Sequence, residues 1–295
     1  MTILAGVVLV GLLIWLYWHF FYQQVRFALN YQADWGHTMV VPLLAGYLVY
    51  LQRDKLRNTA FRTNWLGLLP IFLGIFLYIA CSYGIPAWRH HNLMGAGVSL
   101  TIFGLVLLFF GWRATLILLF PMLYLFVFGQ TVSTRLMDIV THPMQDITAR
   151  GSHFVMDLFL DIDRMGNTLF IFHEGKSIPL NIAEACSGMR MLMAFFALGV
   201  LLAYTGLPRM WQRILLVMMA LPTAIVVNIL RVITLGVLSL YDTQLAAGDF
   251  HELVGLVWLV PAYLLFLGIR QVIRNLVLEE EDGAGDQATS KRGGD

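Results

Sequence analysis

Long apolar runs separated by short polar loops organise most of the sequence. About twenty apolar residues cross a bilayer as an α-helix, so the pattern predicts about eight membrane spans. They are expected at residues 3–22, 37–51, 65–83, 94–112, 114–129, 188–206, 214–240 and 252–270. The second and fifth runs are shorter than the others. The predicted fold class is an all-α integral membrane protein.

The composition agrees with a chain embedded in lipid. Hydrophobic residues make up 59% of the 295 residues and charged residues 13%, whereas a soluble globular chain carries about a quarter charged residues. The formal net charge is +1 and there is no basic tract, so nucleic acid is not an expected partner. The first apolar run has no basic segment before it and no small-residue cleavage site after it, which favours a retained helix over a signal peptide.

Basic residues gather in alternate short loops and helix ends. Loops on the cytoplasmic side of a membrane carry an excess of Lys and Arg. On one side of the expected topology these residues are Arg53, Lys55, Arg57, Arg62, Arg113, Arg209, Arg213, Arg270 and Arg274. The short loops opposite carry few. The bias predicts cytoplasmic N- and C-termini, and an outward-facing segment 130–187 and loop 241–251. The membrane in which the protein is expected is the inner (cytoplasmic) membrane.

The segment 130–187 is the one sizeable stretch expected outside the bilayer. Apolar residues recur in it at helical spacing around Pro143, namely Leu136, Ile139, Val140, Met144 and Ile147. This spacing is typical of one or two amphipathic helices on the membrane surface. Two β-prone runs, 168–172 and 177–182, flank a Gly-containing turn and predict a β-hairpin that caps the sixth span.

The last residues, 279–295, are acidic and then rich in Gly, Ser and Lys. Such a composition predicts a disordered cytoplasmic tail, to which no catalytic role is assigned. Residues 1–278 are then expected to form one polytopic membrane domain.

Cys186 stands where a polar segment becomes a membrane helix. Asn181 and Glu184 have the spacing of a capping box, which predicts a helix start near residue 182. The helix dipole in the first turns favours a thiolate, and Arg190 lies four residues on along the same face. Both effects lower the pKa of a thiol, and the thiolate is the nucleophilic form.

Other features weigh against a reactive Cys186 or leave it open. Glu184 and the apolar surroundings raise the pKa of the thiol, so the two influences oppose each other. A small apolar packing residue is the alternative interpretation, and it is the one adopted for Cys81 inside its apolar run. Gly188 leaves room for a substrate or another backbone. Ser187 before Gly188 faintly resembles an intramembrane serine protease, but the flanking pattern does not support one.

Arg231 is expected about 25 Å along the seventh span, in its outer third. An arginine at the centre of a membrane helix costs about 2.5–3.5 kcal/mol on insertion scales. Asn228, three residues earlier, shares its helical face and favours a polar seam turned to the bundle interior. The alternative is an arginine that reaches the outer headgroups.

His251 is the third candidate. Asp249 and Glu252 have capping-box spacing, which places His251 in the first turn of the last span, at the outer surface. Cys186, Arg231 and His251 are thus expected near the same face on three helices that can be neighbours. A thiolate, an imidazole for proton transfer and a guanidinium for an oxyanion complete a set for acyl transfer.

The remaining histidines and motifs indicate no cofactor. His90 and His91 are adjacent in an outward loop, but no Cys/His spacing is typical of a structural zinc site. The sequence contains no Gly-x-Ser-x-Gly elbow, His-Glu-x-x-His helix or phosphate-binding loop. Neither a metal nor a cofactor is expected.

Three ordered motifs resemble those of the exosortase/archaeosortase family: Ala185-Cys-Ser-Gly-Met-Arg190, Asn228-Ile-Leu-Arg-Val232, and His251-Glu252 at the start of the last helix. The resemblance covers roughly residues 90–270, which would be the catalytic core. It implies a membrane cysteine transpeptidase whose partners are exported surface proteins with a C-terminal sorting signal. That signal is a short motif, a transmembrane helix and a basic tail.

The resemblance also implies roles for the motif residues. Cys186 would form a thioester with the substrate, His251 would act as general acid and base, and Arg231 would bind the substrate or stabilise the oxyanion. Supporting or substrate-binding positions would be Arg190, Asn228, Glu184, Ser187 and Gly188.

Two other functions compete with this one. In a transporter or a glycosyltransferase-like component of polysaccharide export, Arg231 and His251 would bind an anionic lipid-linked substrate and Cys186 would be incidental. A histidine-ligated haem protein is the third and weaker interpretation.

Overall fold

The computed structural model describes residues 3–30, 36–84, 89–129, 134–182, 189–242 and 248–292. The backbone alone is described at residues 3, 134–138, 189–191, 248–252, 256 and 277–292. The chain forms two compact units, Met1–Thr134 and Arg135–Asp295. Each unit has its own helices and its own packing.

The first unit is helical in all its regular elements. These are α1 (Ile3–Leu16), α2 (Trp18–Asn30), η1 (Gly36–Met39), α4 (Val41–Leu51), α5 (Arg53–Arg57), η2 (Trp65–Gly67), α6 (Leu68–Tyr83) and α7 (His91–Phe128). The α6 and α7 backbones approach closely where Gly74 faces Gly97 and Thr101. The approach is so close that a Cβ at Gly74 would overlap both residues. Small residues permit such contact between membrane helices, where lipid supplies no hydrophobic drive.

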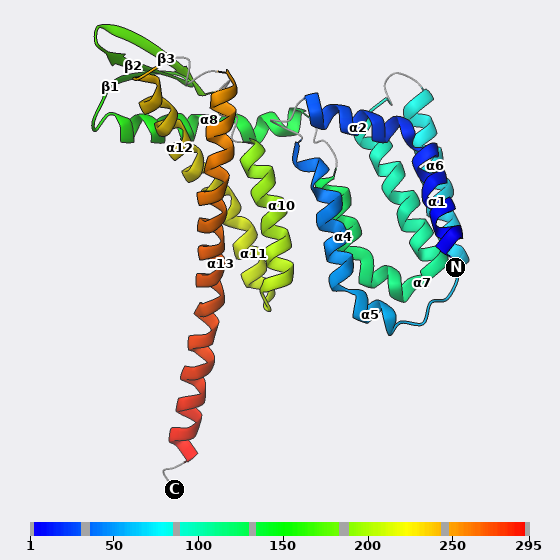
Figure 1. Ribbon diagram of the computed structural model, residues 1–295. Coiled ribbons are helices and arrows are strands. Elements are labelled where there is room, and N and C mark those ends of the chain that lie inside the picture. Colours follow the sequence, from blue (N-terminus) through cyan, green and yellow to red (C-terminus); the bar gives the residue numbers. More distant parts are fainter. Residues whose placement is uncertain are drawn as a thin grey trace. The chain divides into compact units, whose positions relative to one another are not determined.

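α7 is broken at one residue. Gly111 has φ 78° and ψ 179°, a conformation that glycine adopts without a steric penalty. Figure 1 shows α7 changing direction along its length. The expected spans 94–112 and 114–129 meet at Arg113, and the break falls two residues before it.

The second unit combines helices with a small sheet. Its elements are α8 (Thr134–Met156), β1 (Asp161–Met165), β2 (Thr168–His173), β3 (Lys176–Asn181), α10 (Met189–Gly206), α11 (Met210–Met218), α12 (Ala220–Ser239) and α13 (Gly248–Arg292). The sheet is antiparallel in the order β1-β2-β3, with Ile171 opposite Ile162 on one side and Ile178 on the other. The predicted hairpin is confirmed, and β1 is a third strand that the sequence analysis did not predict.

One apolar core joins this sheet to the helices. Residues from the strands, including Leu169 and Ile171, are buried together with Met156 of α8, Leu235 of α12 and Val254 of α13. The helix predicted in the outer segment is therefore present as α8, but its inner face covers protein rather than only a membrane surface. The sheet and α8 together form a platform beside α12.

Among the described residues, four helices are long and apolar enough to cross a membrane. They are Trp65–Tyr83, His91–Phe128, Met210–Ser239 and Leu253–Leu276, and the pair Leu4–Leu16 and Trp18–Asn30, bent by 72°, makes a fifth if it is one span. Gly36–Leu51 and Leu192–Gly206 are shorter apolar helices. Within the described residues the eight predicted spans are therefore confirmed only in part, because expected spans two and six form shorter helices and spans four and five share α7.

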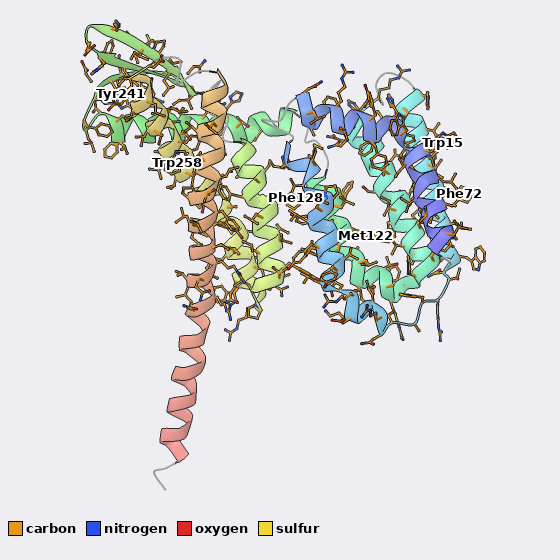
Figure 2. All side chains as sticks on the ribbon, viewed as in Figure 1. Trp15, Phe72, Met122, Phe128, Tyr241 and Trp258 are labelled. Atoms are coloured by element: carbon orange, nitrogen blue, oxygen red, sulfur yellow. The ribbon has the colours of Figure 1, made fainter. Side chains whose placement is uncertain are left out.

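The helices carry large apolar side chains on their outer surfaces. Trp15 is 77% exposed and Phe72 is 66% exposed, and both are labelled in Figure 2. Such side chains are unfavourable in water over a wide surface. Their exposure agrees with helices that face lipid.

α13 continues to Arg292 and so includes most of the tail, 279–295, for which the composition predicts disorder. A Gly-containing, acidic helix is only marginally stable in water on its own. The expectation of a disordered tail stays a prediction.

Candidate active site

The structure describes the predicted site residues unequally. Glu184, Cys186, Ser187 and Gly188 lie outside the described residues. Arg190 in α10 and His251 in α13 are described by their backbone, and Arg231 and Asn228 in α12 with their side chains. Of the predicted capping box at Asn181 and Glu184, Glu184 also lies outside the described residues. The second predicted capping box has Asp249 as its N-cap, but α13 already includes Gly248 and Asp249, so Asp249 lies inside the helix.

The helices expected to carry the three candidates pack against one another. α10, which begins three residues after Cys186, contacts α12, and α12 contacts α13. The expected topology allows these helices to be neighbours, and the contacts of α12 with α10 and α13 agree with it. Arg231 and His251 thus stand on adjacent helices, and the chain from Cys186 enters a helix that packs on the one bearing Arg231.

Arg231 is buried on α12. Only 6% of the residue is exposed, and arginine is rarely buried to this extent unless it interacts with other groups. An arginine that reached the headgroups would keep its guanidinium at the surface. The burial therefore supports the polar seam over the snorkelling alternative.

The guanidinium of Arg231 packs on the bare backbone of α13. A Cβ added at Gly255 would lie 2.7 Å from a terminal nitrogen of Arg231 and 2.8 Å from its Cζ. His251 is one helical turn before Gly255, and residues four apart share a helix face. The α13 position of His251 therefore belongs to the face that Arg231 contacts.

A second contact holds α12 and α13 in register. The indole Nε1 of Trp258 donates a hydrogen bond to Oγ1 of Thr234 at 3.2 Å. Trp258 is one turn after Gly255, and Thr234 is one turn after Arg231. Figure 2 labels Trp258 on α13. This bond maintains the approach of the two helices beside the Arg231–Gly255 contact.

The polar seam extends from α12 to α8. Asn228 Nδ2 donates a hydrogen bond to Oγ1 of Thr148 at 3.2 Å, and the two residues are 1% and 0% exposed. Ser152, one turn after Thr148, is fully buried as well. Within the described residues, Asn228 Oδ1 and Ser152 Oγ have no hydrogen-bond partner. The seam thus contains two buried polar atoms that can form further hydrogen bonds.

Sequence reasoning missed Thr148 and Ser152. The apolar spacing in α8 indicates a surface helix and does not predict that any of its polar residues are buried. The two residues are four apart and share a face, which was the available signal. Nothing in the sequence showed that this face packs on α12.

Thr148→Val tests whether this bond supports the seam. The valine keeps the shape but removes the acceptor, so a buried amide loses its partner. We expect the free energy of unfolding in mixed detergent micelles to fall by about 1 kcal/mol. Thr223→Val is the matched control, because the hydroxyl of that buried α12 residue donates a hydrogen bond to O of Met219, the N-cap of the same helix. Equal loss of stability in both variants would contradict a special role for Thr148.

A cluster of charged side chains links the sheet to α8. Asp146 of α8 pairs with Arg150 at 2.8 Å and with Arg164 of β1 at 3.0 Å. Hydrogen bonds from Arg150 and then from Arg164 hold the pKa of the Asp146 carboxyl below its usual value. Exposed ion pairs add little stability, so this cluster mainly sets the position of β1 on α8.

The described side chains offer no metal centre. Among them, no group of three or more His, Cys, Asp or Glu residues is close enough to hold a metal ion. The chemistry that the described part of the site supports is electrostatic, through a buried guanidinium between two helices.

The fold and this seam define a multi-pass membrane protein with a polar site between packed helices. The model of the transmembrane exosortase family (Exosortase_EpsH) matches residues 26–268. The chain belongs to the transmembrane exosortase family. No curated protein and no solved structure is significantly similar to it.

Proposed function

We propose that this exosortase is a membrane-embedded cysteine transpeptidase that cleaves the C-terminal sorting signal of exported surface proteins and transfers them to an acceptor. The observation that carries the proposal is the burial of Arg231 against Gly255, one turn from His251. Family membership adds the sorting role. The multi-pass fold suits a substrate whose signal includes a membrane helix.

The first half of the reaction forms a thioester. The Cys186 thiolate attacks the carbonyl carbon of the scissile peptide, and negative charge develops on the carbonyl oxygen. The C–N bond then breaks as His251, which holds the proton given up by the Cys186 thiol, passes that proton to the leaving amine. The acyl part of the substrate stays bonded to Sγ of Cys186.

The second half releases the product. An acceptor nucleophile gives its proton to His251 and attacks the thioester carbon, and the C–S bond breaks to return the thiolate. Arg231 has the same role in both halves. Its guanidinium, fixed against α13, stabilises the oxyanion, and donors held in a low-dielectric site act more strongly there than in water.

The proposed setting follows the basic-loop bias. The protein lies in the inner membrane with both termini in the cytoplasm, and the site opens at the outer face. Substrates arrive there after export, with their basic tail on the cytoplasmic side.

The test is processing of a co-expressed protein that ends in a short motif, a membrane helix and a basic tail, followed on a gel. We expect cleavage by the wild type and a loss of about a hundredfold or more in Arg231→Ala and His251→Ala. The matched controls are Arg150→Ala and His173→Ala, which remove exposed residues of the same types from the same unit. Undiminished cleavage in both site variants, at equal membrane levels, would favour a binding or transport role.

A further inference from the structure

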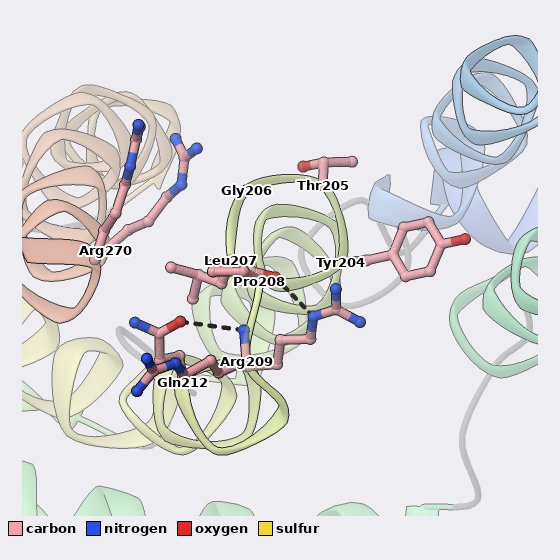
Figure 3. Close-up of a pocket in the computed structure, with 10 residues that line it drawn as sticks. Tyr204, Thr205, Gly206, Leu207, Pro208, Arg209, Gln212 and Arg270 are labelled. Atoms are coloured by element: carbon pink, nitrogen blue, oxygen red, sulfur yellow. Dashed lines mark hydrogen bonds between the residues drawn. The ribbon is translucent and has the colours of Figure 1, made fainter. Parts of the chain in front are cut away.

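A pocket rich in arginine opens in the second unit, away from the seam. Its volume is about 790 Å³, and it lies between the end of α10, the start of α11 and α13 (Figure 3). Four arginines line it: Arg209, Arg213, Arg270 and Arg274. None of the described residues lining it is acidic. A pocket of this size with one sign of charge fits an anionic ligand.

The pocket is held in shape by Gln212. This residue is fully buried, and its Nε2 donates a hydrogen bond to Ile273 O of α13 at 3.0 Å. Its Oε1 accepts from the backbone N–H of Arg209 at 3.2 Å, as Figure 3 shows. One side chain thus fastens the start of α11 to α13. Gln212 therefore fixes the backbone at Arg209 on this side of the pocket before any ligand binds.

A second bond orients Arg213. Its Nε donates to Leu207 O at 2.8 Å, drawn as a dashed line in Figure 3. Its guanidinium also lies 5.9 Å from the ring centre of Tyr204. Arg213 of α11 therefore holds the preceding loop between α10 and α11 in place through this hydrogen bond.

Arg270 has a buried donor atom that an anionic ligand could bind. Its guanidinium lies against Gly206, where any Cβ would overlap it. Its Nε is buried and has no hydrogen-bond partner among the described residues. A buried donor without a partner is unfavourable, and more so when it belongs to a charged group. An anion in the pocket would satisfy this donor.

The position of Arg270 and Arg274 along α13 indicates the source of the anion. Arg270 and Arg274 lie in the last turns of the apolar stretch Leu253–Leu276. On the α11 wall, Met210 is 69% exposed and Trp211 is 46% exposed, next to Arg209. Cations beside exposed tryptophan are typical of the layer where a bilayer meets water. The ligand is then a component of the headgroup layer.

We propose that this pocket binds the phosphate group of an anionic phospholipid. Guanidinium groups match the oxygens of a phosphate in bidentate geometry. The site is distinct from the proposed cleavage site, since Arg270 follows Gly255 by about 22 Å along α13. It lies at the helix end that the basic-loop bias assigns to the cytoplasm.

The test is native mass spectrometry of the full chain in detergent, titrated with phosphatidylglycerol or phosphatidylcholine. Wild type should bind one phosphatidylglycerol saturably and prefer it to phosphatidylcholine. Arg270→Gln/Arg274→Gln should weaken that binding by about tenfold or more, as expected for lost charge-assisted bonds. The matched control, Lys55→Gln/Arg57→Gln, removes the same charge from exposed residues of the basic helix α5 and should bind as wild type does.

Three outcomes would overturn the proposal. They are equal affinity in the pocket variant and its control, no preference for phosphatidylglycerol over phosphatidylcholine, and tight binding of inorganic phosphate that displaces the lipid. The last would identify a soluble phosphate ligand instead. If the double variant does not fold, Arg274→Gln alone changes an exposed residue and should still weaken binding.

Discussion

Cys186→Ser is expected to reduce processing of the co-expressed substrate by about a thousandfold or more. A serine hydroxyl has nearly the same size, but it is not ionised near neutral pH and is a much weaker nucleophile than a thiolate. The proposed thioester requires sulfur. A role for Cys186 as a small packing residue would tolerate the exchange.

The thioester itself provides a direct measurement. With wild-type protein, hydroxylamine should release the substrate's acyl part as a hydroxamate, detected by mass spectrometry, and Cys186→Ser should yield none. The matched control is Cys81→Ser, since Cys81 is 1% exposed in α6 and packs with Tyr17 and Met94 in the first unit. Processing by Cys186→Ser at the rate of Cys81→Ser would exclude thiol catalysis.

Gly255→Leu is expected to reduce processing by about tenfold to a hundredfold while the protein still accumulates in the membrane. A side chain there would displace the guanidinium of Arg231, and a shift of about 1 Å in a positioning group can cost a hundredfold in rate. The displaced group is the end of a flexible side chain, so folding should suffer less than catalysis. The measurements are processing on a gel and the thermal unfolding midpoint.

Gly268→Leu is the matched control for this substitution. It changes the same residue type on the same helix, and a Cβ at Gly268 would have no heavy atom within 4 Å. Both leucines raise helix propensity equally. If the two variants processed substrate at the same rate, the Arg231–Gly255 contact would have no part in the reaction.

Parts of this structure were predictable because their signals are local. The β-prone runs around the Gly-containing turn predict β2 and β3, and the spacing of Asn228 and Arg231 predicts a shared buried face, which the structure confirms. β1 was missed because its sequence, Asp161-Ile-Asp-Arg-Met165, is mostly charged. It pairs with β2 and buries only Ile162 among its five residues.

Other features depend on packing that periodicity does not encode. Apolar length predicted the spans, but it did not distinguish a full crossing from a short helix such as Leu192–Gly206. The contact between Arg231 and Gly255 joins residues of two helices, and a lone glycine in an apolar run has many uses. The roles of Cys186 and His251 stay predictions from the motifs.

The burial of Arg231 has a consequence for biogenesis. An arginine at the centre of a membrane helix costs about 2.5–3.5 kcal/mol on insertion scales, and less in the outer third of the span, where Arg231 is expected. Asn228 finds its partner Thr148 in chain already synthesised, whereas Gly255 leaves the ribosome only after α12. The contact between Arg231 and Gly255 therefore forms only after α13 has been translated. We expect stable integration of α12 to depend on α13, so that the two helices insert as one unit.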